Sequence, residues 1–373
     1  MTTNEDSVHG DPAPLDSAPQ PDKDSPLRTG AFDEKPEMPA DESATSADAP
    51  VAAYAAYACP APAEEVIAAE LAGEPAAKPR AWTALLVGIL AIPVAAIVGG
   101  IVLAVAMLAS HGTGFLRGGP GMETWLEDFA QTRFGLFVII VPGQLVFLAA
   151  ALGAAWLSPQ SLTGRLDLGR GRLPWWSWIV LMLGTPIIGV LSSHVLSLLV
   201  DDMSDQLKMV EAMMRTHVRD FPLGLLVLVA VVPGFVEELL FRGYLQSRLL
   251  RCWPPLSAVG FSALVFSVAH LDPVHVLGVI PLGLWLGTIA WRAGSIWPAI
   301  LCHAVNNAAA VTATMFQDTG TLELTWDPFS VTLLALGGPA FLASVGILAW
   351  NGGRQDRRIK GDITDVDGPA KER

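Results

Sequence analysis

The chain has 373 residues, of which 52% are hydrophobic and only 16% are charged, and its mean hydropathy is +0.45. A soluble globular protein carries roughly 25% charged residues, so the composition argues against that class and for a membrane protein. The formal net charge is −13, but residues 1–80 hold −11 of it, with 16 acidic and 5 basic residues. The acidity therefore belongs to the N-terminal segment, and we expect no nucleic-acid partner for the apolar remainder.

Residues 1–80 are rich in Pro, Ala, Asp, Glu and Ser, and they show no sustained apolar periodicity. Such a segment cannot bury enough apolar surface to offset the entropy that it would lose on ordering. We therefore expect a disordered acidic tail. No basic region followed by an apolar stretch begins at Met1, so no cleaved signal peptide is expected.

Eight apolar segments follow the tail: residues 82–109, 135–157, 175–200, 221–247, 255–271, 273–291, 294–316 and 329–350. Most reach the ~20 residues that an α-helix needs to cross ~30 Å of hydrocarbon. The fifth and sixth are shorter and meet at Asp272-Pro273, so their shared turn is expected near or within the membrane. The pattern predicts an all-α polytopic membrane protein with eight transmembrane helices over residues 81–350 and a C-terminal tail over 351–373.

Lys and Arg are unevenly divided between the two sets of connecting loops. If the N-terminus is inside, 12 of them fall on the inner side and 5 on the outer side. Because cytoplasmic loops carry an excess of these residues, both termini are predicted to be cytoplasmic, with the body in the cell membrane. On the outer side, residues 201–220 space Met and Val among charges. This pattern indicates an amphipathic helix that lies on the surface or caps the bundle; an ordinary extramembrane helix fits it equally well.

Two adjacent carboxylates, Glu237 and Glu238, interrupt the fourth apolar segment. Inside a bilayer such groups are costly unless they are paired, protonated or next to a polar cavity, so they indicate a functional site. Arg242 lies on the helical face of Glu238, four residues later. Neighbouring residues point ~100° apart, so we expect one glutamate to pair with Arg242 and the other to face His270. Pro233 lies one turn earlier and predicts a kink that opens the helix to water.

Polar groups on two later segments lie at a similar depth. Counted at ~1.5 Å per residue from the inner side, Glu237, His270, His303 and Asn307 fall in a slab less than ~10 Å thick. A carboxylate and an imidazole can take a proton from one water, while a second imidazole and an amide can stabilise an oxyanion. No GxSxG motif is present, and Cys302 points ~100° away from His303, the next residue of the helix. The set predicts a polar intramembrane cavity in which an amide is hydrolysed without a covalent intermediate.

Three motifs with this spacing occur in order on separate segments: E-E-x-x-x-R at Glu237, Glu238 and Arg242, F-x-x-x-H at Phe266 and His270, and H-x-x-x-N at His303 and Asn307. Over about residues 200–315 the chain resembles the CAAX-prenyl protease and bacteriocin-processing (CPBP) family of intramembrane glutamic endopeptidases. The resemblance implies that Glu237 and His270 activate water, that His303 and Asn307 form the oxyanion hole, and that Glu238 supports them with the arginine of its motif.

The same resemblance implies a membrane-embedded or lipidated protein or peptide as substrate, the lipid bilayer as surroundings, and no metal or other cofactor. Two other classes stay open. In a zinc-dependent membrane metalloprotease, Glu237, His270 and His303 would bind the metal, although no HExxH helix is present. A scaffold or immunity protein would keep a protease-like core without catalysis. For Asp272 and His275, which follow His270, a role in the turn or in a helix interface is favoured.

Overall fold

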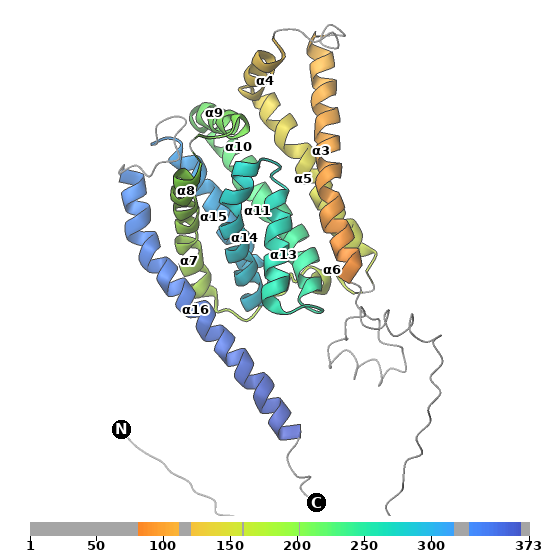
Figure 1. The fold of residues 1–373 in the computed structure, drawn as a ribbon, viewed down its shortest axis with the longest axis vertical. Helices are drawn as coiled ribbons and strands as arrows, with labels where there is room; N and C mark the ends of the chain where they lie inside the picture. Colours follow the sequence, from red (N-terminus) through yellow and green to blue (C-terminus); the bar gives the residue numbers. More distant parts are fainter. Residues whose placement is uncertain (1–80, 112–120, 159, 201, 317–327, 367–373) are drawn as a thin grey trace, which may run out of the picture. The chain divides into compact units, whose positions relative to one another are not determined.

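The computed structural model describes residues 81–111, 121–158, 160–200, 202–316 and 328–366, and all regular structure in these ranges is helical (Figure 1). This confirms the all-α class. The predicted tail over residues 1–80 lies outside the described residues and stays a prediction.

Each of the eight apolar segments contains helix. The first four contain α3 (Ala81–His111), α5 (Arg133–Trp156), α7 (Trp175–Gly184) with α8 (Pro186–Leu199), and a continuous helical run over Pro222–Leu249. The last four contain α13 (Pro255–Val268), α14 (Pro273–Ala293), α15 (Trp297–Ala313) and α16 (Pro328–Val366). The last helix therefore continues 16 residues beyond the predicted end at residue 350.

Six helical stretches are long and apolar enough to cross a membrane: Ala81–Ser110, Arg133–Trp156, Trp175–Leu199, Pro222–Leu249, Pro273–Ala293 and Pro328–Asn351. The chain is therefore a multi-pass membrane protein. The other two segments form shorter helices, because α13 has 14 residues and α15 has 17. These helices rise only about 21 and 26 Å, less than the ~30 Å of a hydrocarbon core. The total of eight spans is not confirmed and stays a prediction.

The run Pro222–Leu249, called the central helix below, is the most enclosed of the six stretches. Within its most apolar window 56% of residues are buried, against 17–39% for the others. It consists of α10 (Pro222–Leu226), η2 (Val227–Val231), α11 (Val232–Glu238), η3 (Leu239–Gln246) and α12 (Ser247–Leu249). Helix α5 packs on one side of it and α15 on another, while α3 covers α5 and α14 covers α13 (Figure 1). Helices α5 and α15, which pack against the central helix, both carry polar residues.

Short polar side chains fix where several helices begin. Thr132 accepts a hydrogen bond from the backbone of Gly135 at the start of α5, and Asp272 accepts one at the start of α14. Such N-caps satisfy backbone N–H groups that have no partner within the helix. Helix α14 ends at Ala293 and is followed by the C-cap Gly294, whose φ of 58° is a left-handed conformation that glycine adopts without strain. The cap at Asp272 holds the shared turn before α14 in a defined position.

The loops that were predicted to lie on one side of the membrane contact one another. The N–H of Ile296 donates to the carbonyl of Asp167 at 3.1 Å, and the indole of Trp297 donates to the carbonyl of Leu168 at 2.9 Å. Short helix α6 (Leu162–Arg165) lies at this end of the described helices, and α9 (Asp205–Asp220) lies at the opposite end (Figure 1). Helix α9 confirms that residues 201–220 contain a helix. Its position on the outer surface stays a prediction.

Candidate active site

The central helix changes its hydrogen-bond pattern on both sides of the two glutamates. At the end of η2, the N–H of Val232 donates to the carbonyl of Val227, five residues earlier. After η3, the N–H of Ser247 donates to the carbonyl of Arg242, again five residues earlier. These are π-helical turns, which are rare and occur mostly at functional sites. Helix α11, which ends at Glu238, is thus held between two π-helical segments, and these set the direction in which the carboxylates point.

Pro233 explains the first of these segments. It has no N–H, and in a regular α-helix the carbonyl of Val229 would pair with the N–H of residue 233. Asn307 of α15 supplies a replacement, because its Nδ2 donates to the Val229 carbonyl at 3.0 Å. Gly234 allows this close approach of the helices, since a Cβ there would lie 3.0 Å from the nitrogen of Ala304. The hydrogen-bond pattern is thus interrupted at Pro233, and a side chain of the neighbouring helix donates to the freed carbonyl. The predicted kink that opens the helix to water stays a prediction.

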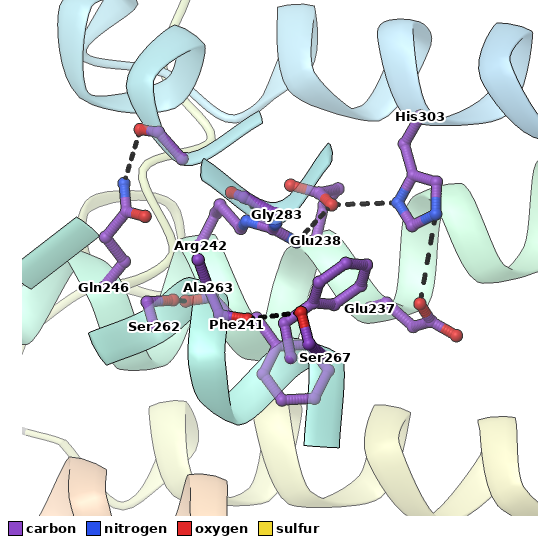
Figure 2. Close-up of polar contacts among 12 residues, drawn as sticks. Glu237, Glu238, Phe241, Arg242, Gln246, Ser262, Ala263, Ser267, Gly283 and His303 are labelled. Carbon is purple, nitrogen blue, oxygen red and sulfur yellow. Dashed lines mark hydrogen bonds and ion pairs between the residues drawn. The ribbon is translucent and has the colours of Figure 1, made fainter. Parts of the chain in front are cut away.

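Glu238 is fully buried and accepts two hydrogen bonds through one oxygen. Its Oε1 lies 2.6 Å from Nη1 of Arg242 and 2.9 Å from Nδ1 of His303 (Figure 2). The ion pair expected from the four-residue spacing is therefore present. Arg242 also donates through Nη2 to the carbonyl of Gly283 at 3.0 Å. A buried pair is costly to desolvate, and these additional hydrogen bonds compensate part of that cost.

Glu237 has a different environment, since 9% of its surface stays exposed whereas Glu238 has none. Its Oε1 accepts a hydrogen bond of 2.8 Å from Nε2 of Gln144 on α5. Its Oε2 lies 4.0 Å from Nε2 of His303, on the side of the ring opposite to Glu238 (Figure 2). His303 therefore lies between the two carboxylates. Because a carboxylate only accepts hydrogen bonds, Nδ1 of His303 carries a proton in this arrangement.

His270 lies just beyond the end of α13. Its Nδ1 is 3.2 Å from the carbonyl oxygen of Phe266 and 3.3 Å from that of Ser267. Carbonyl oxygens only accept hydrogen bonds, so Nδ1 is the donor and Nε2 is the basic nitrogen with a free lone pair. Within the described residues no hydrogen bond joins His270 to Glu237. Glu237 and His270, which are expected to act on one water, are thus held by separate partners: Gln144 holds the carboxylate and backbone carbonyls hold the imidazole.

The ring of Phe266 lies between the two histidines. It is fully buried, and its centroid is 5.3 Å from that of His270 and 5.6 Å from that of His303, both in edge-to-face geometry. The guanidinium of Arg242 stacks over the same ring at 4.2 Å, an attractive cation–π arrangement. The phenylalanine of the F-x-x-x-H motif therefore spaces the two imidazoles and orders the arginine.

Two further expectations concern the turn and the metal alternative. Asp272 accepts the backbone N–H of His275 at 2.8 Å, which confirms its role in the turn. The ring of His275 lies 4.4 Å from that of His270, centroid to centroid. In the part of the chain that the structure describes, no group of three or more His, Cys, Asp or Glu side chains is arranged to hold a metal ion. The zinc alternative therefore gains no support from the geometry.

Gln144 is the residue that reasoning from the sequence missed. It lies on α5, before the region 200–315 in which all the motif residues occur. The available signal was a single carboxamide in an otherwise apolar segment, two residues after Pro142. A polar residue at such a position is expected to face other helices rather than lipid, but the sequence does not say which one.

Comparison with known proteins agrees with the motifs. The family model for type II CAAX prenyl endopeptidase Rce1-like proteins matches residues 219–309. The match contains Glu237, Glu238, Arg242, His270, His303 and Asn307. It confirms the resemblance and indicates a protease. No curated protein and no solved structure matches the chain.

Proposed function

Because residues 219–309 match the Rce1-like CAAX prenyl endopeptidases, we propose that the chain is an intramembrane endopeptidase of the glutamic type. It hydrolyses a peptide bond in a membrane-embedded or lipidated protein or peptide. The observation that carries the proposal is the position of His303 between two carboxylates. Glu238 is fully buried and paired, whereas Oε2 of Glu237 accepts no hydrogen bond from the described residues.

In the proposed reaction, a water molecule at Oε2 of Glu237 attacks the carbonyl carbon of the substrate. As the new C–O bond forms, the proton of the water passes to the carboxylate, and Nε2 of His270 is the second basic group on this side. The tetrahedral intermediate then collapses and the C–N bond breaks. The same proton passes to the leaving amine, so no covalent enzyme intermediate forms.

The negative charge of the intermediate is assigned to donors on α15. Nε2 of His303 faces away from Glu238, which holds the opposite nitrogen. When this nitrogen carries a proton, it can donate to the oxyanion. Asn307 uses one amide hydrogen for the Val229 carbonyl, and its second amide hydrogen remains for the substrate. Glu238 and Arg242 support the site by fixing the ring of His303.

The surroundings of the site restrict the substrate. Glu237 is 9% exposed and His303 is 2% exposed, and both lie on helices of a multi-pass membrane protein. We therefore propose a substrate that reaches the site from the bilayer. We also propose that the short helices α13 and α15 lie within the membrane and complete eight spans around a polar cavity. On this arrangement both termini are cytoplasmic, as the distribution of basic residues predicts.

The test compares membrane proteomes of cells that carry the wild-type chain, Glu237→Gln, or the control Glu211→Gln. Glu211 pairs with Arg215 on α9, a helix that carries none of the residues proposed to act in catalysis. We expect a cleavage product that is present with wild type and with the control but absent with Glu237→Gln. Unchanged products at equal membrane levels of the variant would instead favour a scaffold. Cleavage by purified protein after strong chelation separates the metal-free mechanism from the zinc alternative, which predicts that activity is lost.

A further inference from the structure

Gln144 reaches the site from a helix outside the family match. Its neighbours at the same helical spacing, Phe147, Ala151 and Ala155, are buried in the cluster that contains the central helix. Phe147 packs edge-on against Phe241 of η3, with the ring centroids 5.7 Å apart. Positions i, i+3, i+7 and i+11 share one face of a helix. The same face that packs α5 against the central helix therefore presents the amide of Gln144 to Glu237.

Among the described residues, Gln144 donates the hydrogen bond that Glu237 accepts, and His303 makes a longer ion-pair contact of 4.0 Å with its other oxygen. The charged and titratable groups near this carboxylate are Arg242 on η3, His303 on α15 and His270 after α13, and Glu238 is the next residue of its own helix. Arg242 is committed to Glu238 and to a backbone carbonyl. His303 donates to Glu238 and is 4.0 Å from Glu237.

We infer that Gln144 is a positioning residue for the proposed reaction: its amide N–H holds Oε1 of Glu237 and turns Oε2 toward the water. The inference rests on the proposed function. A carboxamide suits this task because it donates at every pH and brings no charge into the bilayer. Without this donor, the carboxylate of Glu237 loses the hydrogen bond that fixes its orientation toward the water.

The chain contains a matched control for this residue. Gln246 on η3 is also a buried glutamine, and its Nε2 donates to the carbonyl of Gly287 at 2.8 Å. In both Gln144 and Gln246 the side-chain oxygen is buried and has no hydrogen-bond partner among the described residues. Among the described residues, no hydrogen bond joins Gln246 to Glu237. Replacement of either glutamine by methionine keeps the approximate size and removes one donated hydrogen bond.

The experiment uses the full chain in liposomes and a peptide whose cleavage is lost in Glu237→Gln. We expect Gln144→Met to lower kcat/KM by about 10- to 100-fold, the effect of one hydrogen bond to a charged group. The loss is expected in kcat while KM stays within about twofold of the wild-type value, because the amide acts on the carboxylate and not on the bound substrate. Gln246→Met is expected to lose comparable stability while its kcat stays within about threefold of the wild-type value. Equal kcat values in Gln144→Met and Gln246→Met would overturn the inference.

A second measurement does not depend on cleavage. Infrared spectra at one fixed pH record the carboxyl bands of Glu237, identified as the bands that Glu237→Gln removes. The inference expects these bands to shift in Gln144→Met, because Oε1 loses its hydrogen bond, and to keep the wild-type frequency in Gln246→Met. Identical bands in Gln144→Met and wild type overturn it. If Glu237→Gln cleaves as well as wild type, the proposed function fails, yet the infrared shift still decides whether Gln144 holds the carboxylate. The two failures are therefore distinguishable.

Discussion

The amide of Asn307 donates a 3.0 Å hydrogen bond to the carbonyl of Val229, the group that would pair with residue 233 if that residue were not proline. One side chain of α15 thus compensates for a missing backbone donor on the central helix. This contact fixes how the two helices lie against each other, and both proposed oxyanion donors lie on α15.

Asn307→Leu is expected to lower the free energy of unfolding by about 1–3 kcal/mol, because it removes the side-chain hydrogen bond to the Val229 carbonyl. In the Pro233→Ala background, residue 233 supplies its own N–H and the same substitution should cost less. Chemical denaturation in detergent of both single variants and the double variant measures this coupling. Strictly additive losses would show that Asn307 does not compensate for the proline. Cleavage should stay low in the double variant, since the proposed oxyanion donor is still absent.

The two glutamates are expected to respond differently to loss of charge. Glu238→Gln leaves the buried guanidinium of Arg242 without its carboxylate, so the free energy of unfolding should fall by about 3–5 kcal/mol. Glu237→Gln removes no ion pair with arginine and should lose cleavage with little loss of stability. Denaturation curves and cleavage assays on both variants give the comparison. A stable, inactive Glu238→Gln beside an unstable Glu237→Gln would reverse their roles.

Gly234→Ala tests the close packing of α11 on α15. A Cβ at this position would lie 3.0 Å from the nitrogen of Ala304, so the helices have to separate by a few tenths of an ångström. Overpacking of this kind costs about 1–3 kcal/mol, and the 4.0 Å between Glu237 and His303 should widen with loss of cleavage. Gly99→Ala on α3 is the control, because its Cβ would meet nothing within 4 Å. Wild-type cleavage in Gly234→Ala would contradict the prediction.

Asp272 links acidity to stability at the turn before α14. Burial raises the pKa of Asp272, but hydrogen bonds from the backbone of His275 and from Ser204 outweigh it and hold the pKa below its usual value. A carboxyl with a lowered folded-state pKa stabilises the fold above about pH 4 and loses that contribution as the pH falls further. Asp272→Asn keeps an N-cap and should remove this part of the acid dependence. Chemical denaturation of both proteins between pH 6 and pH 3 gives the test. If the denaturation midpoint falls by the same amount in Asp272→Asn as in wild type, the prediction is refuted.

Periodicity and motif spacing were sufficient for the helices and for the pair Glu238–Arg242, because both depend on residues within one or two turns. The partner of His303 was not predictable in this way. Its contact with Glu238 depends on the rotation and spacing of α15 against α11, which Gly234 and the bond from Asn307 determine. Gln144 was missed for the same reason. It lies 93 positions before Glu237, whose carboxylate it contacts, and residue spacing predicts contacts only within one helix.

Because Gln144 lies on α5, residues 219–309 do not contain the whole site. A chimera that carried residues 219–309 into another helix bundle would contain every motif residue and yet leave Glu237 without its amide donor. A homologue that keeps the motifs but has an apolar residue at the position of Gln144 would be expected to turn over its substrate more slowly. The motifs alone would then assign both proteins the same activity, although their rates would differ.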